Sequence, residues 1–367
     1  MRICLLGEYS NVHNGLSEGL KALGHEVCVI SDGDGWKNYD RDIDISRRST
    51  GVIDTLKYII KLRKVIHRIK GYDIVQLINP MFLELRAEHI KPFYTYLRKH
   101  NHKLILGAFG MDYYWVKTCL DCKTFKYSDF NIGKKSRTEE PYNKLFIRDW
   151  LYGSKGKLNR YIAEDCDGIV CGLYEYFKCY KPHYAKKSTY IPFPIHLNSS
   201  ENEKHSRSEY PIKFFIGIQK GRHDYKGTDI MLKALLRLKK NYPTRCEIIK
   251  AESVPFSQYT KMLDSSDILL DQLYSYTPGM NGLLAMSKGI ILVGGGEEEH
   301  YNLLNENRLR PIINVSPDED DVYKKLEYIV IHPEDIQRLS QESVEYVKEH
   351  HDYIKVANQY IDYWKSV

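Results

Sequence analysis

The sequence lacks any long apolar run. Its uninterrupted apolar pieces, such as Ile268-Leu269-Leu270, are as long as the core of one strand and far too short to cross a bilayer. Residues 1–7 are followed at once by polar residues, without the longer apolar stretch and small-residue cleavage site of a signal peptide. We therefore expect a cytoplasmic protein.

A complete set of zinc ligands is also missing. Cys119 and Cys122 form a CxxC pair, but no second CxxC or HxxxH pair accompanies them, and Cys166 and Cys171 have the wrong spacing. Other cysteines lie in apolar runs, where a free thiol behaves as a small hydrophobe. We expect no metal and no cofactor, with a redox or metal role of the CxxC pair as the minor alternative.

Neither sign of charge dominates. The 54 Lys and Arg against 48 Asp and Glu give a net charge of +6, which suits anionic phosphates or lipid headgroups but falls short of a nucleic-acid-binding protein. A hydrophobic content of 43% with 28% charged residues indicates a globular protein. The 367 residues are too many for one ordinary core and suit two α/β domains.

The first half of the chain alternates short β-branched runs with helical patterns. The predicted strands are 2–6, 26–30, 73–78, 103–108 and 167–171, and the predicted helices are 14–23, 52–70, 83–99 and 157–165. Strand, helix and strand at this spacing indicate a parallel sheet covered by helices. Residues 127–148 have no clear period and are predicted to be a long loop or insertion.

The same alternation restarts after a polar interval at 198–210, which we predict to be a linker. The second set of strands is 212–217, 246–250, 267–271, 290–293 and 312–315, and the helices are 228–240, 256–264, 279–288, 297–305 and 320–331. The predicted organisation is an N-terminal domain (1–197), a C-terminal domain (211–332) and a helical segment (333–367) with an aromatic face. Ligands of such doubly wound sheets collect at the carboxyl ends of the strands.

One candidate anion site follows the first strand of the C-terminal domain. The strand ends at Gly217, and the next loop carries Lys220, Arg222 and Lys226 before Gly227 and a helix that Thr228 is suited to cap. Loop cations beside a helix N-terminus attract an anion through their charge and through the unpaired amides of the helix. The alternative is a solvated basic loop with a well-capped helix.

A second candidate segment begins at Asp271. After a loop, Pro278-Gly279 opens another helix, and glycine there lets a ligand approach the backbone closely. The first-turn amides are available to a phosphate, and the residues concerned are Gly279, Met280, Asn281 and Gly282. The alternative is a simple strand-turn-helix.

Together these two segments resemble the retaining GT-B glycosyltransferases of family 4 (glycosyl transferases group 1). The matching residues are Gly217, Lys220 or Arg222, Lys226-Gly227, Asp271-Gln272-Leu273, Gly279 and Ala285-Met286-Ser287-Lys288-Gly289, with Asn14-Gly15-Leu16 and Leu23-Gly24-His25-Glu26-Val27 near the N-terminus. The resemblance implies an α/β fold with two Rossmann-like doubly wound domains that face a central cleft. It also implies a C-terminal helix that packs back toward the N-terminal domain.

The resemblance implies an activity as well: transfer of a sugar from a nucleoside-diphosphate sugar to a saccharide or lipid-linked acceptor, without a metal, in polysaccharide or surface glycan biosynthesis. The residues expected to act on the leaving diphosphate and the reacting sugar are Lys220, Arg222, Lys226 and Asp112. The residues expected to bind the donor are Gly217, Gly227, Tyr276, Gly279, Met280, Asn281 and Gly282.

The sequence departs from the family at two acidic positions. The family carries two glutamates where this chain has Tyr276 and Leu284, and neither side chain can act as an anionic acceptor. This departure favours one alternative, a catalytically silent homologue that binds a sugar nucleotide or a protein. A sugar-nucleotide 2-epimerase is a second alternative. A dinucleotide oxidoreductase is disfavoured, because Gly7-Glu8-Tyr9-Ser10 lacks the GxGxxG fingerprint.

Asp112 is the main candidate in the N-terminal domain. It follows a predicted strand with Gly110, as in the related motif His-Gly-x-Asp, although Phe109 stands where a histidine is common. A carboxylate at a strand end can accept a hydrogen bond from a sugar hydroxyl. Capping of the next turn is the equal alternative, and Glu8 is a weaker candidate.

Residues 56–70 form a predicted basic helix with six Lys or Arg and no acid. Ile59, Leu62, Ile66 and Ile69 give it an apolar face. Such a helix can lie on an anionic membrane. The sequence favours the other interpretation, a helix packed on the first sheet with a solvated basic face.

Overall fold

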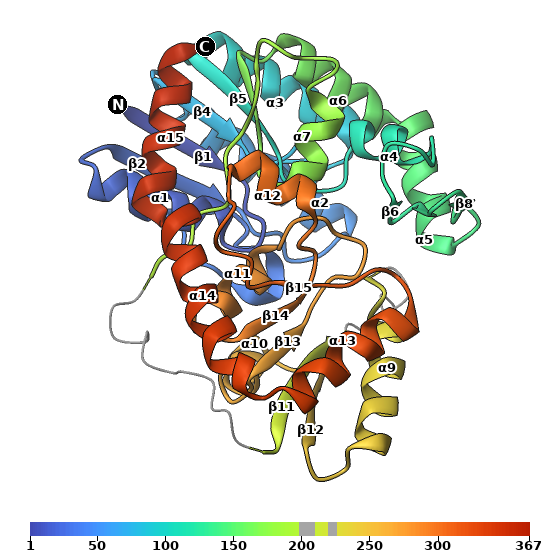
Figure 1. Ribbon diagram of the computed structural model, residues 1–367. Coiled ribbons are helices and arrows are strands. Elements are labelled where there is room, and N and C mark those ends of the chain that lie inside the picture. The colour runs from blue at the N-terminus through green and yellow to red at the C-terminus, as the bar shows by residue number, and fades with distance from the viewer. Residues whose placement is uncertain (198–209, 219–225) are drawn as a thin grey trace. The chain divides into compact units, whose positions relative to one another are not determined.

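A computed structural model describes residues 1–197, 210–218 and 226–367 (Figure 1). The chain divides into two compact units. The first contains Met1–Leu120, Thr138–Pro194 and Tyr353–Val367, and the second contains Asp121–Arg137 and Ile195–Asp352. Residues 121–137, which we had placed in the N-terminal domain, are thus grouped with the second unit. The predicted linker lies outside the described residues except for Tyr210.

The first unit is built on a sheet of seven parallel strands in the order β10-β9-β5-β4-β1-β2-β3. The strands are β1 (Arg2–Leu6), β2 (Glu26–Ser31), β3 (Ile43–Asp44), β4 (Ile74–Leu77), β5 (Lys103–Ala108), β9 (Gly168–Cys171) and β10 (Ser188–Tyr190). Central strands such as β1 and β4 are buried along almost their whole length. Continuous apolar runs of this kind are typical of a parallel sheet that is covered on both faces.

The helices of the first unit fall between these strands, as the alternating pattern predicts, except for the last helix of the chain. They are α1 (Val12–Ala22), η1 (Gly35–Lys37), α2 (Val52–Ile66), α3 (Ala87–His100), α4 (Tyr113–Cys119), α5 (Pro141–Phe146), the π-helix η2 (Ile147–Tyr152), α6 (Ser154–Asp165), α7 (Tyr174–Tyr180) and α15 (Tyr353–Ser366). Helix α15 lies beside α1 (Figure 1), where a Cβ atom on Gly19 would come within 2.3 Å of the Tyr353 carbonyl oxygen. The prediction that a C-terminal helix packs back on the N-terminal domain is confirmed.

The second unit contains a sheet of five parallel strands in the order β12-β11-β13-β14-β15. The strands are β11 (Ile212–Ile218), β12 (Cys246–Glu252), β13 (Ile268–Leu270), β14 (Ile291–Gly294) and β15 (Ile313–Asn314). The helices are α9 (Thr228–Asn241), α10 (Phe256–Asp264), α11 (Met280–Ser287), α12 (Glu298–Leu304), α13 (Glu319–Ile331) and α14 (Glu334–His350). One apolar core joins the sheet to α9 and α13 through residues such as Phe214, Leu235 and Leu326.

Residues 127–148 were predicted to be a long loop or insertion, and the loop alternative is wrong, because they contain a small antiparallel sheet and α5. Its strands are β6 (Tyr127–Ser128), β7 (Asn131–Ile132) and β8 (Lys135–Ser136), which are too short to show a period in the sequence. The segment 333–367, predicted to be helical, consists of two helices, α14 and α15, which belong to different units.

Each large sheet has one point at which the order of its strands reverses. In the first unit this point lies between β1 and β4, and in the second it lies between β11 and β13. The crevice outside the carboxyl ends of the strands at such a reversal is where doubly wound sheets bind ligands. None of the helices in the described ranges has the length and apolarity needed to span a bilayer.

Candidate functional site

The two segments singled out in the C-terminal half meet at the reversal between β11 and β13. The amide of Leu273 donates a hydrogen bond to the carbonyl oxygen of Lys226 over 3.1 Å. Gly227 has φ +71°, and a Cβ atom there would lie 2.6 Å from the Cβ atom of Leu273. Only glycine takes this backbone conformation at this distance without strain. The Lys226-Gly227 pair therefore packs directly against the segment that follows β13.

Helix α9 begins immediately after this contact. Its N-cap is Gly227 and its first residue is Thr228, so the prediction that Thr228 is the cap was wrong by one residue. The backbone reason is the left-handed conformation of Gly227, which turns the chain into the helix one position earlier. Lys220 and Arg222, the other two predicted cations, lie outside the described residues.

A chain of polar side chains crosses the same edge of the sheet. The Nδ2 atom of Asn281 donates to Oδ1 of Asp271 over 3.3 Å, and the hydroxyl of Tyr259 donates to Oδ1 of Asn281 over 3.2 Å. Gly217, at the end of β11, leaves room for Tyr259, since a Cβ atom there would lie 2.9 Å from its ring. Residues of β11, α10 and α11 and the residue after β13 are thereby joined at one place.

The charge of Asp271 is balanced from two sides. Burial raises the pKa of Asp271, while the positive charge of Lys226 and the hydrogen bond from Asn281 lower it in part. Asp271 thus accepts a hydrogen bond from the first turn of α11, and the positive charge of Lys226 partly offsets its negative charge.

The first amides of α11 are available to an anion. Gly279 is the N-cap, the first turn of the helix has no acidic residue, and within the described ranges no side chain caps it. A Cβ atom on Gly279 would lie 3.0 Å from Nε2 of Gln272, so the backbone is closely approached here. The first amides of a helix carry partial positive charge and lack intrahelical acceptors.

Most of the predicted donor-binding residues lie at this edge. They are Gly217, Gly227, Gly279, Met280, Asn281 and Gly282. Lys226, which is predicted to act on the leaving diphosphate, lies beside them. Tyr259 and Gln272 join them, although no motif had marked Tyr259, and Gln272 had been noted only as part of a triplet. Their part in the cluster depends on the packing of α10 and of the loop after β13, which the sequence does not reveal.

Tyr276 contacts the small antiparallel sheet. Its side chain is buried, its ring contacts the rings of Phe125 and Tyr127, and its hydroxyl accepts a hydrogen bond from the amide of Lys126. Tyr276 therefore helps to attach the small antiparallel sheet to the second unit. A donor-binding role for Tyr276 stays a prediction.

Glu297 is the acidic centre of this attachment, and sequence reasoning missed it. It lies just after β14 and accepts hydrogen bonds from Nζ of Lys126 at 2.8 Å, from the hydroxyl of Tyr127 at 2.7 Å and from Nδ2 of Asn314 at 3.1 Å. Burial raises the pKa of Glu297, but these hydrogen bonds outweigh burial and hold it below its ordinary value. Lys126 and Glu297 are 171 positions apart, so no local pattern could have paired them.

In the first unit, Asp112 caps α4. Its two carboxylate oxygens accept hydrogen bonds from the amide of Trp115 and the hydroxyl of Tyr180, each at 2.8 Å. The side chain is fully buried, and burial raises its pKa to about 7. The structure thus gives Asp112 the capping role that the sequence had left open. A catalytic role stays a prediction.

Comparison with known proteins agrees with this architecture. Residues 225–362 match the model of a family described as glycosyl transferase-like. Solved structures of glycosyltransferases match over 98% and 99% of the chain. The chain is similar to this glycosyl transferase-like family and has the GT-B fold.

Three solved structures illustrate how far this GT-B similarity extends. Anabaena Alr3699/HepE in complex with UDP and glucose has a TM-score of 0.61 at 10% identity, with 100% of both chains covered. Sucrose-phosphate synthase from Thermosynechococcus elongatus has a TM-score of 0.61 at 13% identity, with 100% of this chain and 98% of that chain covered. A glycosyltransferase from Rickettsia africae has a TM-score of 0.53 at 13% identity and 99% and 97% coverage. No protein of curated function matches the sequence significantly.

Proposed function

We propose that this GT-B chain transfers a sugar from a nucleoside-diphosphate sugar to a saccharide or lipid-linked acceptor, with retention of configuration and without a metal. The pathway we propose is polysaccharide or surface glycan biosynthesis in the cytoplasm. A solved structure with the same fold, Anabaena HepE, was obtained with UDP and glucose, which supports a nucleoside diphosphate as the leaving group.

The observation that carries the proposal is the junction between Lys226-Gly227 and the segment that leads into α11. It brings one cation and one uncapped helix N-terminus to the strand reversal where doubly wound sheets bind ligands. Both features favour an anion at the same edge.

The chemistry follows from where charge develops. When the bond from the sugar to the diphosphate breaks, negative charge grows on the diphosphate oxygens. In the proposed mechanism Lys226, with Lys220 and Arg222 from the preceding loop, stabilises this charge together with the amides of residues 280–282. The departing phosphate then takes the proton of the acceptor hydroxyl.

The alternative of a silent sugar-nucleotide binder rests on one observation. Tyr276 and Leu284 stand where the resembled family has its glutamates, and Tyr276 is occupied by contacts with the small sheet. The silent binder shares the proposed donor site and lacks only the transfer step.

Substitution of Lys226 tests the site. We expect Lys226→Ala to weaken binding of a nucleoside diphosphate by about 1.5–3 kcal/mol, or roughly 10- to 150-fold in Kd, because a charge-assisted hydrogen bond is lost. Calorimetry with UDP, GDP and ADP measures this effect. Lys240→Ala, which removes an exposed lysine at the far end of α9, is the matched control.

Two outcomes then separate the hypotheses. Unchanged affinity in Lys226→Ala would remove this residue from the site. Binding by the wild type without release of nucleoside diphosphate from any sugar nucleotide, with or without acceptors, would favour the silent binder over the transferase.

A further inference from the structure

Helix α2 exposes a second apolar stripe that the sequence pattern did not indicate. Its buried residues are Tyr58, Leu62 and Ile66, which attach it to the first unit. Four other apolar side chains point to solvent, with exposed fractions of 78% for Val52, 70% for Ile53, 58% for Leu56 and 55% for Ile60. With 3.6 residues per turn, these four lie on one side of the first turns of the helix.

The same side of the helix becomes cationic toward its C-terminal end. Lys57, Arg63 and Lys64 are all exposed, and the spacing of a helix places them alongside and beyond the apolar stripe. The one acid of α2, Asp54, accepts a hydrogen bond from the hydroxyl of Ser49. The exposed face therefore combines apolar and positive groups without an acid of its own helix among them.

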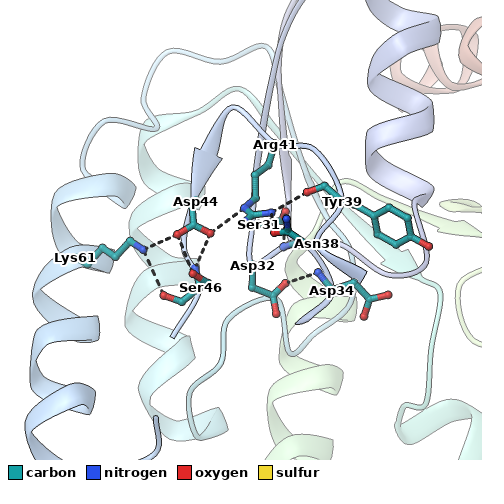
Figure 2. A network of polar contacts seen from close by, with 10 residues as sticks. Ser31, Asp32, Asp34, Asn38, Tyr39, Arg41, Asp44, Ser46 and Lys61 are labelled. Carbon is teal, nitrogen blue, oxygen red and sulfur yellow. Dashed lines mark hydrogen bonds and ion pairs between the residues drawn. The ribbon is translucent and has the colours of Figure 1, made fainter. Parts of the chain in front are cut away.

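Lys61 differs from these three cations. Its ammonium bonds to the carboxylate of Asp44 over 3.1 Å and to the carbonyl oxygen of Ser46, within a network that also contains Arg41 (Figure 2). Figure 2 shows the Lys61 side chain directed toward β3 and the segment after it. Lys61 thus holds α2 to the sheet, and the exposed cations are left for an external partner.

A hollow of about 300 Å³ lies between α2 and α3 and adjoins this face. Helix α2 contributes Ile59 and Arg63 to its lining, and α3 contributes Pro92, Phe93 and Tyr96. The lining is mostly apolar, with the Arg63 side chain among it. Like the exposed face of α2, the hollow thus presents apolar side chains together with a positive charge.

We propose that the exposed face of α2 docks this protein on an anionic lipid bilayer. The apolar stripe of residues 52, 53, 56 and 60 enters the boundary between headgroups and acyl chains, and Lys57, Arg63 and Lys64 bind lipid phosphates. An apolar stripe and a set of cations provide the two contributions that stable peripheral binding requires. This proposal is independent of the proposed function, since it concerns binding alone.

Charge complementarity favours a bilayer over a second copy of the chain. If two α2 helices met antiparallel about a twofold axis, the apolar end of each would face the cationic end of the other. If they met in parallel, the cations would face each other and repel. In an anionic bilayer, the acyl chains can contact the apolar stripe while the headgroups bind the cations.

Vesicle sedimentation with the full-length chain tests the proposal. We expect binding to phosphatidylcholine vesicles with about one third phosphatidylglycerol and little binding to phosphatidylcholine alone, weakening as salt is raised. The double variant Lys57→Gln/Lys64→Gln should lower the partition coefficient by roughly 10- to 30-fold. Leu56→Gln/Ile60→Gln should lower it by at least about tenfold.

Control variants on α9 remove two charges or one exposed apolar side chain. They are Lys233→Gln/Lys240→Gln and Leu236→Gln, all at exposed positions, and they should bind vesicles like the wild type. The proposal is overturned if the chain does not bind anionic vesicles, or if the α2 variants and the α9 controls bind equally. It is also overturned if Leu56→Gln/Ile60→Gln only abolishes self-association measured by light scattering and leaves vesicle binding intact.

Discussion

The helices that begin beside the two strand reversals, α1 in the first unit and α11 in the second, differ in whether a carboxylate binds their first amides. Near β1, the chain supplies its own anion: Glu8 accepts hydrogen bonds from the amides of His13 and Asn14 in the first turn of α1, at 3.3 and 2.8 Å. Near β13, the first turn of α11 has a glycine cap and no acidic residue. A phosphate would compete with a carboxylate at α1, whereas α11 offers it amides and a nearby lysine.

This difference supports our proposal that the anion site lies in the second unit. The carboxylate of Glu8 is buried, and burial raises its pKa to about 7 even though the α1 amides lower it. Beside it the His13 ring bonds to the carbonyl oxygen of Gly7, and burial lowers its pKa to about 4. The first unit thus places a carboxylate of its own chain on the first amides of α1, whereas the first turn of α11 has no acidic residue.

The largest expected effect comes from adding a side chain at Gly227, where the Lys226-Gly227 pair packs against Leu273. Gly227→Val would force a left-handed backbone onto a branched residue and press its Cβ atom against Leu273. We expect a loss of about 2–4 kcal/mol in the free energy of unfolding of the second unit, together with loss of nucleotide binding. Urea unfolding and calorimetry measure the two effects.

Gly71→Ala in the first unit is the control for that substitution. Gly71 has φ +72°, but no atom lies within 4 Å of a Cβ atom built there. This variant should lose only about 1 kcal/mol and keep its nucleotide affinity. If both variants lose the same free energy of unfolding, backbone strain alone explains the destabilisation of Gly227→Val, without the contact to Leu273.

A somewhat smaller effect is expected from neutralising the internal anion of the first unit. The folded-state pKa of Glu8 is raised to about 7 from an ordinary value of 4.5, so folding favours the protonated form. The stabilisation of the wild type by this proton is complete below pH 4.5 and is lost as the pH rises through 7. Glu8→Gln should therefore gain stability relative to the wild type across this window, approaching about 3 kcal/mol.

Urea unfolding of both proteins at several pH values between 4.5 and 7.5 measures this gain. The proposal places the phosphate at α11 and not at α1, so the nucleotide affinity of Glu8→Gln should equal that of the wild type. A difference in stability that stays constant with pH would contradict the account of Glu8. A changed affinity would contradict the assignment of the anion site to the second unit alone.

The sequence predicted the parts of the site that depend on local backbone chemistry. Gly217, the Lys226-Gly227 pair and the helix after Gly279 were found because strand ends, glycine turns and helix starts leave short patterns. The two parallel sheets were predicted for a similar reason: each buried strand is a continuous apolar run followed by a helical period.

What the sequence could not predict depends on contacts between distant segments. The grouping of residues 121–137 with the second unit rests on Lys126, Tyr127, Tyr276 and Glu297, which are too far apart along the chain to form a local pattern. The exposed stripe on α2 was hidden for another reason. The helix is apolar on two sides, and only packing shows that Leu62 and Ile66 lie inside while Leu56 and Ile60 lie outside.

Amide hydrogen exchange with and without a nucleoside diphosphate tests the central claim most directly. The account predicts that a saturating nucleoside diphosphate slows exchange in peptides that cover residues 279–283 and 226–229, and leaves peptides that cover residues 8–16 unchanged. Protection at the start of α1, without protection at the start of α11, would contradict it.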